Sequence, residues 1–202
     1  MGPGAEAPAP TLTAVRRQRP GRVALEVDGH PWRVVPDDVV ARCGLAPGIV
    51  LERPLLRRFR RELRRAEALG AATRSLARRD LSAQRLRERL GARGIRAHAA
   101  EAALTTLASA GVVDDARLAR SRAAALADRG WGDAAVAARL EQEGIDAEAA
   151  RAALSELPPE PERAAALAAG SVDRRAAWSL LARRGFSSDS IEHAVGVLDE
   201  NG

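Results

Sequence analysis

The sequence predicts a mainly α-helical protein, in which tandem three-helix repeats form an elongated, curved array after a small N-terminal segment containing a β-hairpin. Three observations lead to this prediction. Alanine supplies much of the 46% hydrophobic content and aromatic residues only 2% of the chain, a composition that suits close helix packing. A set of apolar positions recurs three times along the chain. Alternation of apolar and polar residues is confined to the N-terminal part.

The N-terminal part divides into a tail and a small folded segment. Residues 1–10 are rich in proline, alanine and glycine and are predicted to be a disordered tail. Residues 11–51 are predicted to form a small β/α segment, because residues 11–19 and 22–27 alternate in polarity. Asp28-Gly29 suits a type I′ hairpin turn, which needs positive φ at both central residues.

A short helix should follow the return strand and end at Gly44. It carries Cys43, the only cysteine of the chain. A lone cysteine cannot form an internal disulfide, so Cys43 is expected to be a small buried hydrophobic residue. This cysteine usage fits a protein of the cytoplasm.

Residues 52–113 are predicted to hold a long basic helix and the first three-helix repeat. Pro54 suits a first helical turn, and the long helix should run from there to Arg79. Leu55, Phe59, Leu63 and Ala66 form its apolar stripe. Helices over 83–92 and 97–110 should complete the repeat.

The repeat is defined by a corner that occurs three times. Leu90-x3-Gly94-Ile95 matches Leu140-x3-Gly144-Ile145 and Leu181-x3-Gly185-Phe186. The second repeat is predicted over 114–157 and the third over 158–202. In this alignment Leu81, Trp131 and Val172 occupy one apolar position, which indicates core packing for all three.

The link between the first two repeats is predicted to set the angle between them. Gly111 should end one helix in the left-handed conformation. Asp114 and Asp115 should cap the next helix, with binding of a cation or of a partner's arginine as the alternative. Arg120, Arg122 and Arg129 could contact a partner or bond to that aspartate pair. The candidate partner contact or inter-repeat joint therefore comprises Gly111, Asp114, Asp115, Arg120, Arg122, Arg129, Gly130, Trp131 and Gly132.

Positive charge is concentrated in one part of the chain. The net charge is +5, yet residues 52–96 hold 15 arginines against 5 acidic residues. This asymmetry indicates a polyanion site, with a solvated helix face as the alternative. The candidate DNA- or filament-binding residues are Arg57, Arg58, Arg60, Arg61, Arg64, Arg65, Arg74, Arg78, Arg79, Arg85, Arg89 and Arg93. No aromatic residues interleave with them, so base-specific reading is not expected.

Several functional classes are disfavoured by what the sequence lacks. There is no lysine and no tyrosine, which excludes a P-loop and a Schiff-base enzyme. The three histidines are isolated, no catalytic constellation occurs, and we expect no enzyme activity, metal or cofactor. No apolar run is long enough to span a membrane. We expect a monomer.

Three motifs resemble the RecX family. They are L-x-R-R-D-L-S-x2-R-L-R-E-R-L-x2-R-G-I from Leu76, G-V-V-D-D-A-R-L-A-R-x-R from Gly111, and R-G-W-G-x7-L-x3-G-I from Arg129. The resemblance covers about residues 66–157 well. One departure is Arg85 three residues after Ser82, where the family often has a glutamate that completes a capping box. This departure predicts a weaker helix start.

The resemblance implies a non-enzymatic regulator that binds the RecA–single-stranded DNA filament, in its helical groove or at its end. Such a regulator would inhibit recombinase, ATPase and coprotease activities, and some direct binding to DNA is also expected. Two alternatives remain open from the residues. One is a general nucleic-acid-binding helical module that acts without RecA. The other is a scaffold whose arginines serve only solubility.

Overall fold

The computed structural model describes residues 9–200, with side chains described through Val197. These residues form two compact units. Unit 1 contains the chain up to Ser75 together with Leu90–Ala103, and unit 2 contains Leu76–Arg89 together with the chain from Leu104 onward. The tail expected at residues 1–10 lies, except for its last two residues, outside the described part.

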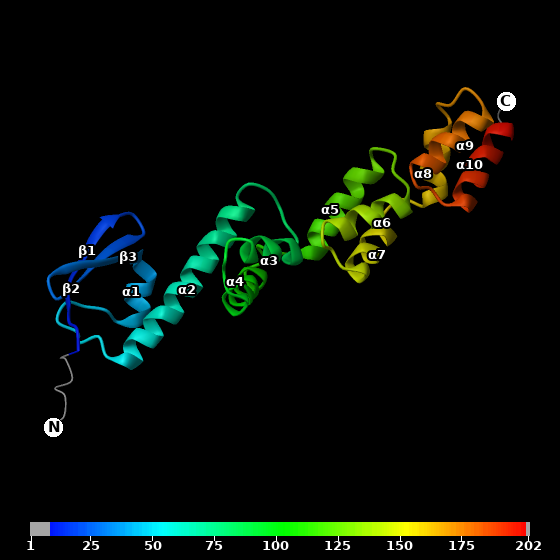
Figure 1. Cartoon of the computed structure of the whole chain (residues 1–202). Coiled ribbons are helices and arrows are strands. Elements are labelled where there is room, and N and C mark those ends of the chain that lie inside the picture. Colours follow the sequence, from blue (N-terminus) through cyan, green and yellow to red (C-terminus); the bar gives the residue numbers. More distant parts are fainter. Residues whose placement is uncertain (1–8, 201–202) are drawn as a thin grey trace. The chain divides into compact units, whose positions relative to one another are not determined.

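Three strands and ten helices occur within residues 9–200 (Figure 1). The strands are β1 (Leu12–Arg19), β2 (Arg22–Val27) and β3 (His30–Pro36). The helices are α1 (Asp37–Cys43), α2 (Arg53–Leu76), α3 (Ala83–Gly91), α4 (Ala97–Ser109), α5 (Asp115–Ala127), α6 (Asp133–Gln142), α7 (Ala147–Ser155), α8 (Glu160–Ala168), α9 (Arg174–Arg183) and α10 (Ser188–Glu200). The prediction of a mainly helical chain with an N-terminal hairpin is confirmed.

The sheet of unit 1 is antiparallel in the order β1-β2-β3. Asp28 and Gly29 have φ of 50° and 80°, so the type I′ turn predicted for them forms between β2 and β3. Val23 of β2 pairs with Val35 of β3, and both side chains are buried. α1 ends at Gly44, which is left-handed as predicted, and Cys43 is buried.

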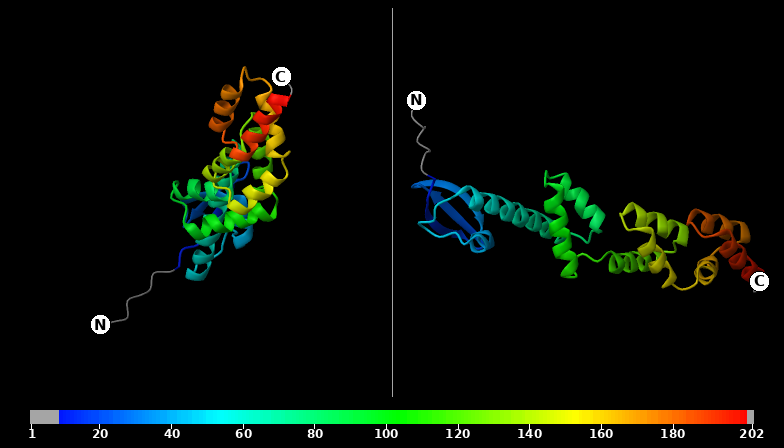
Figure 2. Two further views of the ribbon diagram at one scale, coloured as in Figure 1. Left: turned by 90° about the vertical axis from the view of Figure 1, so that its right-hand side faces the viewer. Right: turned by 90° about the horizontal axis from the view of Figure 1, so that it is seen from below.

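Helix α2 begins beside the sheet (Figure 2), and one face of it shares the core of the sheet. Its Phe59 and Leu63 are buried in one cluster with Val23 and Val35. Trp32 lies at an irregularity of the β2–β3 pairing, and its ring centroid is 5.0 Å from that of Phe59. Because apolar residues of α2 point into this cluster, its arginines occupy the remaining faces.

The three corners have the same backbone geometry. Gly94, Gly144 and Gly185 have φ of 75°, 73° and 76°, and the leucines at Leu90, Leu140 and Leu181 are fully buried. After each glycine the next backbone N–H donates to that leucine's carbonyl oxygen, at 3.1, 3.0 and 3.2 Å. These bonds form the Schellman pattern that a left-handed glycine permits, so the repeated corner is confirmed.

Unit 2 contains two complete sets of three helices. Helices α5, α6 and α7 enclose a core that includes Leu118, Val136 and Leu140. Helices α8, α9 and α10 enclose an equivalent core that includes Leu181 and Val195. In each set the first and third helices lie side by side. The repeat boundaries and the curvature of the array stay predictions.

The prediction for Val172 is wrong. At the aligned positions Leu81 is buried and Trp131 is half-buried, but Val172 is 97% exposed. Leu81 and Trp131 precede helices whose first residues bond to the following repeat. Within the described residues no further repeat lies beside Val172, so the same sequence position has nothing to pack against.

Candidate functional site

Helix α2 carries an exposed arginine face. Arg57, Arg60, Arg61 and Arg64 follow the three- and four-residue spacing that places side chains on one side of a helix. All are exposed except Arg64, which is half-buried. Among described residues, Arg61 of this face forms an ion pair with Glu62 at 3.7 Å. Such an exposed ion pair contributes little to stability. The face therefore retains most of its positive charge.

The arginine face extends to the corner after α3, which also belongs to unit 1. Arg64 lines a hollow of about 300 Å³ together with Arg93 and Arg96. Glu67 is the acidic residue of this lining. Arg96, unlike Arg93 of the same lining, is absent from the set selected from the sequence. Only the packing of α4 on α2, through Ala68, Ala99 and Ala103, brings it there.

The twelve arginines selected from the sequence do not all lie in one unit. Unit 1 holds Arg57, Arg58, Arg60, Arg61, Arg64, Arg65, Arg74 and Arg93, and unit 2 holds Arg78, Arg79, Arg85 and Arg89. Arg79 and Arg85 line a separate hollow of unit 2. The selected set is therefore divided between the two units.

The two aspartates that follow Gly111 cap different helices. Asp114 accepts a hydrogen bond from the backbone N–H of Arg117 at 2.9 Å, so it caps α5 as predicted. Asp115 instead accepts from the backbone N–H of Ala83 at 2.9 Å, which is the first residue of α3. The prediction that both aspartates cap α5 is therefore wrong for Asp115. Its carboxylate connects repeats 1 and 2.

Ser82 supports the start of α3 in a second way. Its hydroxyl accepts from the backbone N–H of Arg85 at 3.1 Å and donates to the carbonyl oxygen of Glu143 at 2.6 Å. The guanidinium of Arg85 donates to the carbonyl oxygen of Gln142. The missing glutamate of the capping box is thus offset by the Asp115 carboxylate. We call this set of contacts joint 1.

Joint 2 connects repeats 2 and 3 in the same pattern. Gly132 aligns with Ser82, and its backbone N–H donates to the carbonyl oxygen of Arg184 at 2.9 Å. The backbone N–H of Asp133, the first residue of α6, donates to the carboxylate of Glu160 at 2.7 Å. Glu160 is the first residue of α8, as Asp115 is of α5. In both joints a carboxylate at the start of one repeat caps the second helix of the preceding repeat.

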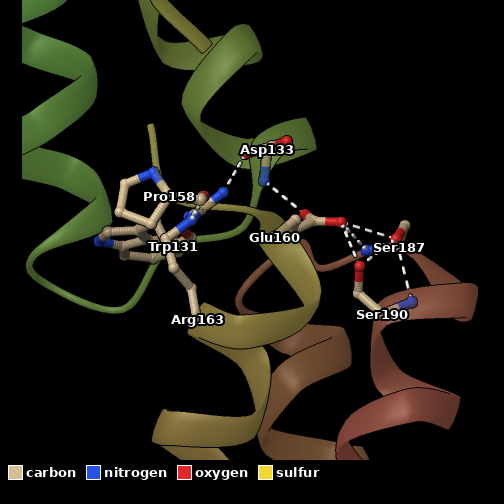
Figure 3. A network of polar contacts seen from close by, with 7 residues as sticks. All are labelled: Trp131, Asp133, Pro158, Glu160, Arg163, Ser187 and Ser190. Atoms are coloured by element: carbon tan, nitrogen blue, oxygen red, sulfur yellow. Dashed lines mark hydrogen bonds and ion pairs between the residues drawn. The ribbon is translucent and has the colours of Figure 1, made fainter. Parts of the chain in front are cut away.

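Joint 2 carries additional polar contacts (Figure 3). Glu160 also accepts from the hydroxyls of Ser187 and Ser190 at 2.6 and 2.8 Å. Arg163 forms an ion pair with Asp133 and donates to the carbonyl oxygen of Trp131 at 3.0 Å. Sequence reasoning missed Glu160 and Arg163, because their partners lie about one repeat away along the chain.

The pKa values of the two joint carboxylates, Asp115 and Glu160, are shifted in opposite directions. Burial raises the pKa of Asp115, the nearby carboxylates of Asp146 and Asp114 raise it further, and the hydrogen bond from Ala83 opposes them. For Glu160, burial alone would raise the pKa. The hydrogen bonds from Ser187, Asp133 and Ser190 outweigh burial, and the pKa is lowered.

Arg120, Arg122 and Arg129 contact residues other than Asp114 and Asp115. Arg122 pairs with Glu143 at 3.1 Å and Arg120 with Glu156 at 3.8 Å. The backbone carbonyl of Arg129 accepts from Arg184 at 2.6 Å. Within the described residues, the alternative in which these arginines bond to Asp114 and Asp115 is therefore not observed.

The described residues show neither a metal-binding cluster nor a thiol with a lowered pKa. In residues 9–197 no cluster of three or more His, Cys, Asp and Glu side chains could hold a metal ion. Burial raises the pKa of the Cys43 thiol, which disfavours the nucleophilic thiolate. None of the described helices is both long and apolar enough to cross a bilayer.

Comparisons with known proteins agree on one family. The chain is 41% identical over 130 residues to Regulatory protein RecX of Stenotrophomonas maltophilia (strain R551-3), covering 59% of this chain and 80% of that protein. It is 38% identical over 149 residues to Regulatory protein RecX of Xanthomonas campestris pv. campestris (strain B100), covering 69% of this chain and 90% of that protein.

Solved structures support the same fold. A crystal structure of regulatory protein RecX aligns with a TM-score of 0.75 and 21% identity, covering 91% of this chain and 97% of that one. RecX from Lactobacillus salivarius aligns with a TM-score of 0.61 and 20% identity, covering 67% and 97%. No family model matches the chain. From its sequence relatives, the chain belongs to the RecX family of regulatory proteins.

Proposed function

We propose that this protein regulates RecA by binding the RecA–single-stranded DNA filament and inhibiting its recombinase, ATPase and coprotease activities. Membership of the RecX family carries this proposal. The protein acts by binding rather than by catalysis, in keeping with the regulatory name of its relatives. It works as a monomer in the cytoplasm and needs no cofactor.

The arginine face of α2 is the surface that we assign to the DNA phosphates of the filament. Its opposite face packs on the β-sheet core, which holds the helix in place and leaves the arginines directed outward. Guanidinium groups bind phosphate oxygens in bidentate geometry. The hollow lined by Arg64, Arg93 and Arg96 extends this surface within unit 1.

The direct test is the single-stranded-DNA-dependent ATPase of the matching RecA, with the purified protein added in substoichiometric amounts. We expect inhibition whose strength falls as salt rises, because phosphate binding releases counterions. Absence of inhibition at every ratio would contradict the proposal.

A four-arginine variant tests the assignment to α2. Changing Arg57, Arg60, Arg61 and Arg64 to alanine should lower the slope of log affinity against log salt. On single strands the decrease should be about 0.7 for each phosphate that the variant no longer neutralises. The matched control changes four exposed arginines elsewhere to alanine, namely Arg17, Arg19, Arg151 and Arg175. Equal decreases in the two variants would refute a specific role for α2.

The basic surface also supports a second candidate, a nucleic-acid-binding module that acts without RecA. It predicts salt-sensitive binding to duplex DNA that the four-arginine variant loses. It also predicts that RecA ATPase is affected only as far as the protein competes for DNA, so added DNA would relieve all inhibition.

A further inference from the structure

A groove of unit 2 is distinct from the arginine face of α2. It occupies about 630 Å³ beside α5 and α6, and we call it the α5–α6 groove. Leu126, Trp131, Ala135 and Ala138 contribute apolar surface to its lining. A second hollow of about 600 Å³ on the joint 1 side shares Arg122, Arg139, Gln142 and Glu143 with this lining, so the two are adjacent. The volume of each suits a short segment of a ligand chain.

Three arginines lie beside these apolar residues in the lining of the groove. Arg122, Arg129 and Arg139 line the α5–α6 groove, and Glu143 is its acidic residue. The Glu143 carboxylate is already shared by Arg122 at 3.1 Å and Arg139 at 3.4 Å. For the side chain of Arg129, no carboxylate partner is recorded among the described residues. The lining thus carries an excess of positive charge around an apolar floor.

We propose that the α5–α6 groove docks an acidic polypeptide segment that inserts one apolar side chain. The apolar side chain would lie on the floor beside Leu126 and Ala138, and the flanking carboxylates would pair with Arg129 and Arg139. Charge complementarity selects the acidic character of the segment. The apolar floor selects an anchor residue, which a nucleic-acid backbone does not offer.

The surroundings of Trp131 favour a polypeptide over a nucleic acid. A base would need a free aromatic face on which to stack. The guanidinium of Arg184 lies over the Trp131 ring, 5.0 Å from its centroid. The ring also packs against the apolar cluster of repeat 2. Trp131 therefore contributes apolar surface to the groove and is not an open stacking platform.

This inference deepens the proposed function and rests on it for its biological partner, which would be a protein surface of the filament. The α2 face would then bind phosphates and the α5–α6 groove would bind protein. Because the two surfaces recognise different chemistry, their ligands can be separated with simple probes. Peptide binding to the groove can also be tested without RecA. A failure of the docking proposal is therefore distinguishable from a failure of the regulatory proposal.

The probe is a blocked, fluorescent peptide of glutamates and aspartates around one central leucine, measured by fluorescence anisotropy with the full-length protein. A matched peptide has alanine in place of the leucine, and oligodeoxythymidylate serves as the nucleic-acid probe. We expect the leucine peptide to bind about tenfold more tightly than the alanine peptide, because the anchor buries apolar surface.

Two variants alter the groove in different ways. Arg129→Glu reverses a charge, and Ala138→Trp fills the apolar floor without changing charge. Each should weaken binding of the leucine peptide by about tenfold or more. Ala138→Trp should leave oligodeoxythymidylate binding unchanged. The control Arg175→Glu makes the same charge change at an exposed site of α9 in unit 2 and should leave peptide binding within about twofold.

Three outcomes would overturn the inference. Equal affinity for the leucine and alanine peptides would show that no apolar side chain anchors the peptide in the groove. Equal weakening of peptide binding by Arg129→Glu and Arg175→Glu would show that the peptide responds only to the overall charge of the protein. Loss of oligodeoxythymidylate binding on Ala138→Trp, with the peptide unbound by the wild type, would assign the groove to nucleic acid. Circular dichroism of each variant verifies that the helices are retained.

Discussion

Replacing Gly132 by alanine should separate repeats 2 and 3. The backbone of Gly132 has φ of −79° and ψ of 167°, a region that any residue adopts. The reason for a glycine at this position is therefore space. A Cβ at Gly132 would lie 2.3 Å from the carbonyl oxygen of Gly185 and 2.4 Å from the backbone nitrogen of Phe186. These backbone atoms cannot turn aside as a flexible side chain could.

The expected cost follows from the interactions that must open. Overpacking of this kind costs about 1–3 kcal/mol. Moving the chains apart also breaks the hydrogen bond from Gly132 to Arg184 and strains that from Asp133 to Glu160, worth about 1 kcal/mol each. We therefore expect a loss of about 2–4 kcal/mol in the free energy of unfolding of unit 2. For a chain of this length, the melting temperature should fall on the order of 10 °C.

Urea unfolding followed by tryptophan fluorescence measures this change. In a Trp32→Phe background the signal comes from Trp131 and Trp178, both of which lie in unit 2. The control is Gly196→Ala, in a helix of the same unit, where an added Cβ meets nothing within 4 Å. That change should stabilise by about 0.5–1 kcal/mol. If Gly132→Ala stayed within about 0.5 kcal/mol of wild type, the argument from close backbone approach would be refuted.

Four further changes test the joints and their link. The pKa of Asp115 is raised, so its contribution to the free energy of unfolding is present below about pH 4 and is lost as pH rises through the raised value. The pKa of Glu160 is lowered, so its contribution is present above about pH 4 and is lost as pH falls through the lowered value. Asp115→Asn and Glu160→Gln should therefore change pH–stability curves with opposite sign, and equal changes would contradict the assignment. Inserting two glycines after Val113 should impair filament binding at nearly unchanged helix content by circular dichroism, and full activity would count against the geometric role of this turn. Ser82→Gly should cost about 1–2 kcal/mol in urea unfolding, because two hydrogen bonds disappear, and a neutral effect would show that solvent replaces them.

Local patterns made much of the fold predictable. The hairpin turn at Asp28-Gly29 and the corners at Gly94, Gly144 and Gly185 depend on backbone conformations that few residues other than glycine adopt readily, so the residue type reports the geometry. The cap at Asp114 is likewise determined within three residues. Such features can be inferred from sequence because both partners of each interaction lie in one short stretch.

Contacts between repeats were not predictable in the same way. The carboxylate of Asp115 reaches a helix whose first residue lies 32 positions earlier, and nothing in the local sequence distinguishes this role from capping α5. For the candidate site, residue type identified the arginines but not their grouping. Arg96 joins Arg64 only through helix packing, and Arg122 and Arg129 line a groove whose apolar residues come from two helices and the segment between them.

The two joints share one plan, and the residue at one equivalent position, Ser82 in joint 1 and Gly132 in joint 2, gives them different tolerance. In joint 1 a side chain, Ser82, spans the gap to Glu143, so the backbones are held apart by one hydroxymethyl group. In joint 2 the backbone of Gly132 contacts the next repeat directly. A side-chain bridge can rotate and re-form, whereas a backbone contact allows one separation only. We therefore expect joint 1 to adjust more readily than joint 2 when a partner docks in the α5–α6 groove.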